Sequence, residues 1–312
     1  MSELGKTRVI FMGTPEFSVP TLAMLVEEGY DVVGVVTQPD RPAGRGRKVT
    51  QSPVKQFALS HGLQVLQPDT LRKPEVVAEL AALRPDVIVV AAYGKILPPK
   101  VLSIPPKGCI NVHASLLPRH RGASPIAAAI LAGDAITGTT IMLMDEGMDT
   151  GPILAQATME VRPDDTAGTL GERLARQGAE LLAATLPMWL AGEITPQPQP
   201  EEGATVCRPI RKEQGRIDWT RPAVEIERMV RAYHPWPGAF TFWEGRLFKI
   251  VRAHVAGGSA APGEVIPWEE GAAVGTGDGL LVLDEVQLAG RRAMPISDFL
   301  RGQRAILGAQ LG

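Results

Sequence analysis

The sequence predicts an α/β fold, with a Rossmann-like open, mostly parallel sheet followed by a small OB-like β-barrel domain. From Arg8 to about Leu190, short β-branched apolar runs alternate with helix-length amphipathic segments, which is typical of a parallel sheet covered by helices. A Pro-rich polar stretch begins at Thr195, and beyond it short alternating runs are separated by Gly and Pro. These changes predict a first domain at residues 1–192, a linker at 193–206 and a second domain at 207–312.

Each element of the first domain is expected from its apolar period. Strands show compact β-branched runs, and helices show longer segments with one apolar face. The expected strands are Arg8–Met12, Asp31–Thr37, Gln64–Leu66, Asp86–Ala91, Cys109–Ala114, Thr139–Met144 and Leu154–Val161. The expected helices are Phe17–Glu28, Pro53–His61, Leu71–Leu83, Ser124–Ala132 and Thr166–Leu190.

The second domain shows the pattern of a small barrel with a helix at its entrance. Its apolar runs are short, alternate in polarity and are separated by turn residues. The expected elements are a helix at Pro222–Ala232, strands at Ala239–Phe242, Leu247–His254, Gly263–Pro267 and Leu280–Gln287, and a last helix at Ser297–Arg304.

The composition favours a cytoplasmic protein. No basic region followed by a long apolar stretch opens the chain, and no run approaches the ~20 apolar residues that a membrane helix needs. Cys109 and Cys207 lie far apart in the sequence, which indicates neither a disulfide framework nor a pair of metal ligands. We expect a cytoplasmic monomer that holds no metal and meets no membrane.

The formal net charge of −2 hides an uneven distribution of charge. Residues 205–312 carry 14 Lys and Arg against 12 Asp and Glu. Between Thr37 and Lys55, the glycines Gly44 and Gly46 with nearby Pro39 and Pro42 predict a long surface loop that suits an anionic partner. Its basic residues outnumber its one acidic residue, Asp40. The basic residues are Arg41, Arg45, Arg47, Lys48 and Lys55.

Polar side chains mark the end of one predicted strand, in the stretch Gly108-Cys-Ile-Asn-Val-His-Ala-Ser-Leu-Leu-Pro118. Because alternate side chains of a strand share a face, Asn111 and His113 are expected to point the same way. Ligands of open parallel sheets bind at the carboxyl ends of the strands. From spacing alone, a structural Asn–His pair is an equally good interpretation.

A second stretch, Met144-Asp-Glu-Gly-Met-Asp-Thr-Gly-Pro-Ile153, places three carboxylates in a Gly-rich loop after another strand. One of Asp145, Glu146 and Asp149 is expected to reach His113. In isolation, the pattern fits a solvated acidic turn better. The two stretches together predict an Asn/His/Asp site.

These motifs resemble the signatures of the 10-formyltetrahydrofolate-dependent formyltransferases. The resemblance rests on Asn111-Val-His-Ala-Ser-Leu-Leu-Pro118 and Gly147-Met-Asp-Thr-Gly-Pro152, and it spans nearly the whole chain. The opening Phe11-Met-Gly-Thr-Pro-Glu-Phe17, the loop Gln38-Pro-Asp-Arg-Pro-Ala-Gly-Arg-Gly46 and Gly215-Arg-Ile-Asp-Trp219 narrow it to family members that act on methionyl-tRNA. One departure is His120, where relatives often have Trp.

The resemblance implies a catalytic trio of Asn111, His113 and Asp149, which fits the chemistry of formyl transfer to an amine. An amine attacks directly and forms a tetrahedral intermediate, whose oxyanion the Asn111 amide stabilises by a hydrogen bond. His113 donates to the same oxygen or relays a proton, and Asp149 stabilises charged His113. No metal is needed for this reaction.

The resemblance further implies two substrate regions. The folate pterin of 10-formyltetrahydrofolate is expected near Ser115, Leu116, Leu117 and Pro118 and near the backbone around Ile88 and Tyr93. A turn that merely closes the strand is the simpler interpretation of Ser115–Pro118. The turn Gly13–Phe17 lacks the further glycines of a dinucleotide fingerprint, so it is expected to face the acceptor, with Phe17 near the methionine side chain or packed in the helix.

The acceptor that the resemblance implies is initiator methionyl-tRNA, and phosphate contacts are expected from basic residues of both domains. In the first domain these are Arg41, Arg45, Arg47 and Lys48. In the second they are Arg208, Arg211, Lys212, Arg216, Arg291, Arg292, Arg301 and Arg304, although an ordinary mixed surface explains part of this set. The remaining histidines, His61, His234 and His254, are expected to be surface or core residues.

Three alternative functions stay open from the sequence. A formyltransferase acting on an amino-sugar nucleotide would share the fold and the trio, but the basic loop suits RNA phosphates better than a small substrate. A glycinamide-ribonucleotide formyltransferase would lack the second domain. A non-catalytic RNA-binding protein would have no need of an intact trio.

Overall fold

The computed structural model describes residues 7–43 and 48–312, and the chain forms two compact units. The first unit runs to Pro125 and adds two later stretches, and the second consists mainly of the carboxyl-terminal third. The later stretches of the first unit are Ile136–Glu160 and Gly171–Cys207, and the second unit comprises Ile126–Ala135, Val161–Leu170 and Arg208–Gly312. The exact division at residues 192 and 207 stays a prediction.

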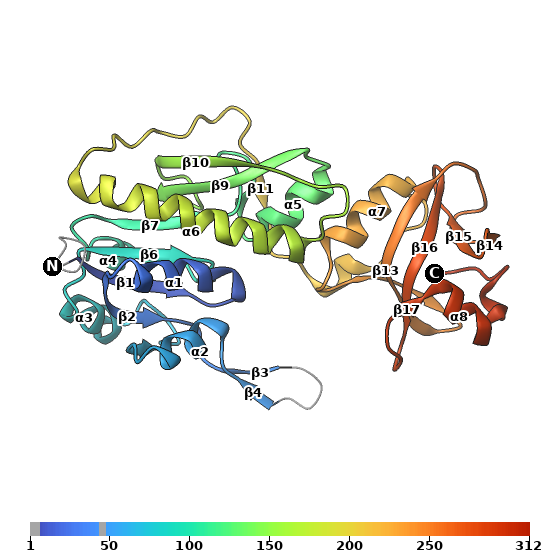
Figure 1. Cartoon of the computed structure of the whole chain (residues 1–312), viewed down its shortest axis with the longest axis horizontal. Helices are drawn as coiled ribbons and strands as arrows, with labels where there is room; N and C mark the ends of the chain where they lie inside the picture. Colours follow the sequence, from blue (N-terminus) through green and yellow to red (C-terminus); the bar gives the residue numbers. More distant parts are fainter. Residues whose placement is uncertain (1–6, 44–47) are drawn as a thin grey trace. The chain divides into compact units, whose positions relative to one another are not determined.

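A seven-stranded sheet forms the centre of the first unit, in the order β10-β9-β7-β6-β1-β2-β5 (Figure 1). Strands β5, β2, β1, β6 and β7 are parallel, whereas β9 is antiparallel to β7 and β10 is antiparallel to β9. This confirms the predicted open, mostly parallel sheet. The strands are β1 (Arg8–Gly13), β2 (Asp31–Val36), β5 (Val65–Leu66), β6 (Val87–Ala91), β7 (Cys109–His113), β9 (Ile136–Leu143) and β10 (Ile153–Glu160).

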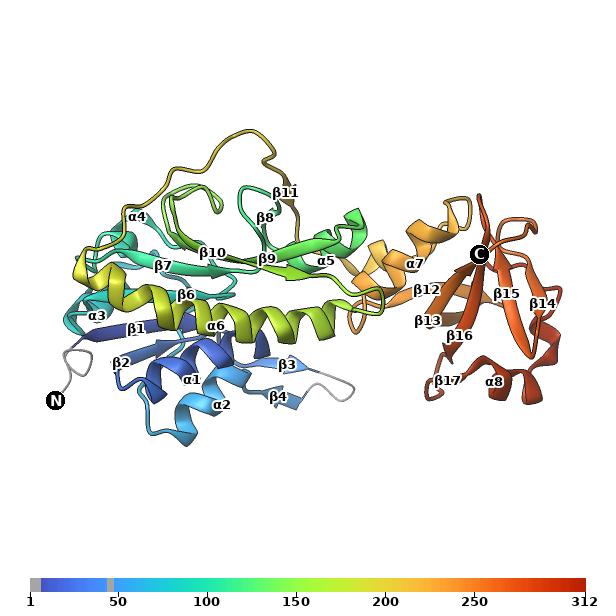
Figure 2. The ribbon, with the colours of Figure 1, turned by 45° about the horizontal axis from the view of Figure 1, so that its top comes forward.

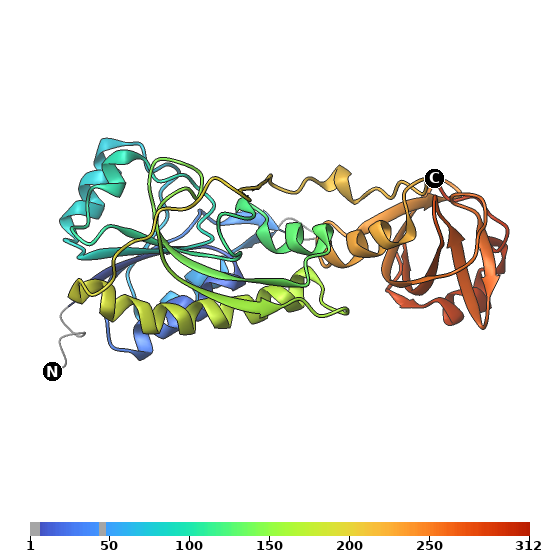
Figure 3. The ribbon, with the colours of Figure 1, turned by 90° about the horizontal axis from the view of Figure 1, so that it is seen from above.

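Helices cover both faces of this sheet (Figure 2, Figure 3). On one face, α1, α2 and α6 pack against the side chains of Val9, Phe11 and Val89, and on the other face α3 and α4 pack against Ile10 and Ile88. Because the side chains of a strand alternate between two covered faces, β1 after Arg8 and the whole of β6 are apolar. The helices are α1 (Val19–Glu27), α2 (Pro53–Ser60), α3 (Pro74–Ala82), α4 (Pro99–Leu102), α5 (Pro125–Ala132) and α6 (Ala167–Ala191), and a 3-10 turn, η2 (Glu16–Ser18), precedes α1.

The predicted surface loop after β2 contains an antiparallel hairpin of β3 (Arg41–Ala43) and β4 (Lys48–Thr50). The sequence indicated only a long surface loop here and did not predict these two short strands. Arg45 and Arg47 lie outside the described residues.

The described part of the second unit is an antiparallel β domain with flanking helices. Its sheet has the order β12-β13-β16-β15-β14, and β17 pairs with β16. This confirms the predicted α/β plus β architecture. The elements are η3 (Lys212–Gly215), α7 (Ala223–Ala232), β12 (Ala239–Trp243), β13 (Arg246–Ala256), β14 (Val265–Trp268), β15 (Gly271–Gly275), β16 (Leu280–Leu288), β17 (Met294–Pro295), α8 (Ile296–Gly302) and η4 (Arg304–Ile306).

The segment that leads from the first unit to the second is mostly extended, and its backbone is hydrogen-bonded to the first unit. The backbone of Gln197 pairs with that of Ile153 at the start of β10. A short strand, β11 (Val206–Cys207), pairs in parallel with β8 (Arg121–Gly122). In the described residues, no helix is both long and apolar enough to cross a membrane.

Candidate active site

The central feature of the site is the carboxyl end of β7, between β6 and β9 in the sheet. Asn111 and His113 are both on this strand, and both are buried, at 8% and 5% exposure. Asp149 lies in the loop between β9 and β10, and β9 pairs with β7 so that His113 is opposite Thr140. The sheet thus brings together residues that are 36 or more positions apart in the sequence.

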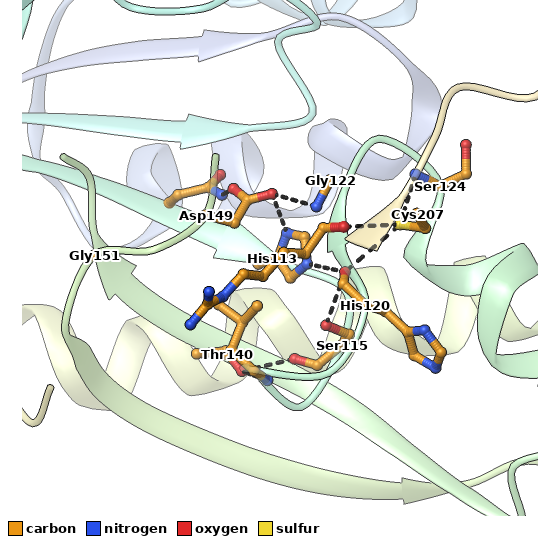
Figure 4. A network of polar contacts seen from close by, with 12 residues as sticks. His113, Ser115, His120, Gly122, Ser124, Thr140, Asp149, Gly151 and Cys207 are labelled. Atoms are coloured by element: carbon orange, nitrogen blue, oxygen red, sulfur yellow. Dashed lines mark hydrogen bonds and ion pairs between the residues drawn. The ribbon is translucent and has the colours of Figure 1, made fainter. Parts of the chain in front are cut away.

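The structure brings the predicted Asn111, His113 and Asp149 together. Nδ2 of Asn111 lies 3.4 Å from Oδ1 of Asp149, and Nδ1 of His113 lies 3.6 Å from Oδ2. The backbone N–H of Gly122 donates a 2.8 Å hydrogen bond to the same Oδ2 (Figure 4). The shared face predicted for Asn111 and His113 is therefore confirmed, because both side chains reach one carboxylate.

The hydrogen bonds of His113 determine which of its nitrogens can react. Nε2 lies 2.9 Å from the backbone oxygen of His120. A carbonyl oxygen only accepts, so Nε2 carries a hydrogen and donates it. Nδ1 then faces Asp149 at a longer distance, and it is the nitrogen that can exchange a proton with a substrate group.

The loop that carries Asp149 is organised by a different carboxylate. Oδ1 of Asp145 accepts from the backbone N–H of Gly147 at 3.0 Å and from Oγ1 of Thr150 at 2.8 Å. Asp149 itself has a left-handed backbone, with φ of 53°. Of the three carboxylates left open by the sequence, Asp149 is the one that faces His113, and Asp145 shapes the turn.

The turn after β7 is held by internal hydrogen bonds. Oγ of Ser115 donates to the backbone oxygen of Arg119 at 2.6 Å, and Oγ1 of Thr140 donates to that of Ser115 at 2.6 Å (Figure 4). Nε2 of Gln156 donates to the backbone oxygen of Leu117 at 2.9 Å. Ser115 and Leu117 are buried, whereas Leu116 and Pro118 are half-buried.

A cavity of about 530 Å³ opens beside the 145–151 loop. Its wall is mainly apolar, with two cationic side chains and one carboxylate. The lining residues are Leu71, Arg72, Val77, Ile96, Leu97, Pro98, Pro99, Lys100 and Glu146. The sequence motifs did not point to these residues, because an apolar cavity wall has the same pattern as an ordinary core.

The six residues predicted to bind folate are not in the wall of this cavity, as far as the described residues define it. Ile88 and Tyr93 are buried in the apolar cluster that also contains Leu71 and Leu97, so they lie behind the wall. Burial raises the pKa of Tyr93 to about 12. The backbone oxygen of Tyr93 already accepts from Oγ1 of Thr14 and Nε2 of Gln38, both at 3.0 Å. A folate role for these six residues stays a prediction.

The predicted acceptor residues are spread over several elements. Phe17 is half-buried in η2, Arg41 and Lys48 lie on the two strands of the hairpin, and Arg208 and Lys212 are exposed in the second unit. Their contact with a substrate stays a prediction.

Neither cysteine has the character of a nucleophile. Burial raises the pKa of Cys109 to about 12, and burial is also the main reason that the pKa of Cys207 is raised. Across residues 7–43 and 48–312, the search for three or more His, Cys, Asp or Glu side chains placed to hold a metal ion finds none.

The fold and the site together define a class of protein: an α/β enzyme with an Asn–His–Asp group at the carboxyl edge of its sheet. Comparison with known proteins agrees. Residues 6–186 match the family model described as formyl transferase, and residues 209–304 match the model of the formyl transferase C-terminal domain. The chain belongs to the formyl transferase family.

Curated relatives are similar over nearly the full length. The chain is 52% identical over 308 residues to a methionyl-tRNA formyltransferase of Myxococcus xanthus, covering 98% of each chain. It is 55% identical over 309 residues to a protein of the same name from Roseiflexus sp., covering 98% of this chain and 95% of the relative.

Solved structures share the fold at low identity. WlaRD, described as a sugar 3N-formyl transferase, has a TM-score of 0.67 at 16% identity and covers 92% of this chain and 99% of its own. HypX from Aquifex aeolicus in complex with tetrahydrofolic acid has a TM-score of 0.64 at 21% identity and covers 95% of this chain and 47% of its own.

Proposed function

We propose that this chain transfers the formyl group of 10-formyltetrahydrofolate to the free amino group of methionine on initiator methionyl-tRNA. The observation that carries the proposal is the meeting of Asn111, His113 and Asp149 at the carboxyl edge of the sheet. Relatives named methionyl-tRNA formyltransferase, 52% and 55% identical over almost the whole chain, support the choice of acceptor. This reaction belongs to protein synthesis, at the initiation of translation.

The three side chains divide the reaction between them. As the amine nitrogen adds to the formyl carbon, negative charge gathers on the formyl oxygen, and a preorganised amide donor there typically contributes about 3 kcal/mol. Asn111 has two amide hydrogens, of which one points to Asp149, so the second is free for this oxygen. Nδ1 of His113 takes up the proton that the amine loses and returns it to the folate nitrogen as the bond between that nitrogen and the formyl carbon breaks and tetrahydrofolate leaves. Asp149 stabilises the imidazolium while it is charged.

The cavity beside the 145–151 loop fits the folate. Folate combines flat aromatic rings with an anionic glutamate tail, and the cavity combines an apolar wall with Arg72 and Lys100. Glu146 in its wall belongs to the same loop as Asp149, which supports a folate site next to the reacting groups. We therefore extend the folate region from the six predicted residues to this cavity.

The basic hairpin favours an RNA acceptor over a small one. Four basic residues lie close together in the sequence, and their positive charges repel one another unless an anion lies against them. They are Arg41, Arg45, Arg47 and Lys48. A sugar-nucleotide acceptor remains the alternative, but the solved sugar N-formyltransferase is only 16% identical to this chain and supports the fold alone.

The function is tested by a direct assay. Purified protein is incubated with 10-formyltetrahydrofolate and either methionyl-tRNA or an amino-sugar nucleotide, and the formylated product is quantified. We expect product with the tRNA and none with the sugar nucleotide. Product with the sugar nucleotide alone contradicts the proposed acceptor, and no product with either contradicts enzymatic function in favour of simple RNA binding.

The role of the hairpin is tested by neutralising Arg45, Arg47 and Lys48 together with alanine. We expect a several-fold weaker affinity for tRNA and a salt dependence that is flatter by roughly 0.7 to 0.9 for each lost phosphate contact. The matched control neutralises Lys73, Arg84 and Arg176, which are exposed elsewhere in the first unit. If both triple variants keep the wild-type KM for tRNA and its salt slope, the hairpin has no part in RNA binding.

A further inference from the structure

A segment of mostly extended chain with a turn at residues 202–203, residues 199–207, lies across both loops of the active site, and we call it the strap. Its first residue contacts the loop that carries Asp149. Nε2 of Gln199 donates to the backbone oxygens of Asp149 and Gly151, both at 2.8 Å, while its Oε1 accepts from Nε of Arg121 at 3.0 Å. One side chain therefore joins the 145–151 loop to the turn that follows β7.

The other end of the strap accepts hydrogen bonds from backbone N–H groups of the second loop, the turn that follows β7. The N–H of His120 donates to Oγ1 of Thr205 at 2.8 Å, and the N–H of Arg121 donates to the backbone oxygen of Thr205 at 2.8 Å. A side chain on Gly122 would lie 2.3 Å from the backbone oxygen of Cys207, so a glycine is required for this approach. The strap is thus built into the site at both ends.

Each of the two loops contains one residue with an unusual backbone conformation, and the strap is hydrogen-bonded to both residues. Asp149 and His120 are both left-handed, with φ of 53° and 60°. This conformation is disfavoured for residues other than glycine, and it persists where surrounding contacts fix it. Gln199 bonds the backbone of Asp149, and Thr205 bonds the backbone of His120, whose oxygen is the acceptor for His113.

We propose that the strap positions the catalytic trio, with Gln199 and Thr205 as its positioning residues. Gln199 fixes the peptide that aims the Asp149 carboxylate at Asn111 and His113. Thr205 fixes the peptide that aims the oxygen of His120 at Nε2 of His113. The proposal rests on the proposed function for its kinetic readout, but not for its structural one.

The kinetic test is Gln199→Ala, with Gln197→Ala as the matched control. Nε2 of Gln197 donates to the neighbouring oxygen of Thr195, so its loss leaves the site untouched. Small misplacements of reacting groups strongly lower turnover, so we expect Gln199→Ala to reduce kcat about tenfold, with KM for folate and tRNA changed less than about twofold. The control should keep both constants. A kcat within about twofold of wild type, or a rise in KM without a fall in kcat, overturns the proposal.

A second pair of variants separates positioning from general stability. Thr205→Val removes the oxygen that accepts from His120, whereas Thr205→Ser keeps it. We expect the valine variant to lose several-fold in kcat and the serine variant to recover wild-type turnover, at similar melting temperatures. Equal kcat in the two variants overturns the role of Thr205.

An observable independent of activity is the amide of Gly122, which donates to Oδ2 of Asp149. We expect its NMR resonance to shift in Gln199→Ala and to stay in place in Gln197→Ala. An unmoved Gly122 amide in Gln199→Ala overturns the positioning role of the strap even if kcat falls. An inactive wild-type chain with the expected amide shift contradicts the proposed function and leaves the strap intact.

Discussion

Two aspartates lie in two loops of the first unit, and their surroundings differ. At the base of the β3–β4 hairpin, Asp40 accepts from Nζ of Lys55 at 2.6 Å and from Nε2 of Gln67 at 2.8 Å. In the active site, Asp149 has no such short contact to a cationic side chain among the described residues: it faces an amide at 3.4 Å and an imidazole at 3.6 Å. The side-chain contacts of Asp40 are short and include a charged ammonium group, while the side-chain contacts of Asp149 are longer and leave room for a substrate to compete.

This difference separates a structural carboxylate from the one that we propose to act in catalysis. The hydrogen bond from Lys55 is the largest cause that lowers the pKa of Asp40, and the bond from Gln67 adds to it. The charge of Asp40 is thereby matched by the ammonium group of Lys55. Asp149 is paired instead with the imidazole of His113, the group that takes up and returns a proton in the proposed reaction, so the charge opposite Asp149 changes as the reaction proceeds.

The largest effects on turnover are expected for the two side chains of β7 to which the proposed mechanism assigns the chemistry. Asn111→Ala and His113→Ala should each lower kcat by about two or more orders of magnitude, because they remove an oxyanion donor or a proton-transfer group. Folate binding, measured by titration, should change little. His61→Ala serves as the control, since His61 is exposed on the last turn of α2. Near-normal turnover in either variant removes that residue from the mechanism.

A smaller loss is expected when the charge alone is removed. Asp149→Asn keeps an oxygen for the N–H of Gly122 but cannot stabilise an imidazolium, so kcat should fall about tenfold or more and its pH profile should change. The matched control is Asp145→Asn in the same loop, because asparagine still accepts from Gly147 and Thr150. The contrast fails if both variants lose the same activity.

Sequence periodicity predicts much of the arrangement of Asn111, His113 and Asp149. The period of two along β7 predicts that Asn111 and His113 share a face, and the structure confirms it. Periodicity does not decide which carboxylate of a Gly-rich loop turns inward. That choice depends on the bonds of Asp145 to Gly147 and Thr150, which the sequence does not reveal.

The features that the sequence did not predict depend on contacts between segments that are far apart in the chain. Gln199 lies 50 residues after Asp149, and its two hydrogen bonds to that loop have no sequence signature beyond an extended Pro-rich stretch. Strand β15 was missed for another reason. Apart from Val274 it consists of Gly and Ala, which have little β propensity. A side chain on Gly275 would lie 2.2 Å from the backbone oxygen of Ala261, so close packing rather than strand propensity selects this glycine.

The smallest effect is expected at the structural aspartate. Asp40→Asn keeps an acceptor for Gln67 but removes the charge opposite Lys55, and a surface ion pair of this kind shifts the melting temperature by roughly 1 to 3 °C. Because the folded-state pKa of Asp40 is lowered, the stabilisation is complete above the unfolded value of about 3.9 and is lost as pH falls through the folded value. Thermal melts of both proteins from pH 7 down to about 2 should therefore converge at the acidic end. A difference that stays constant over this range would show that the carboxylate charge is not what holds the base of the hairpin.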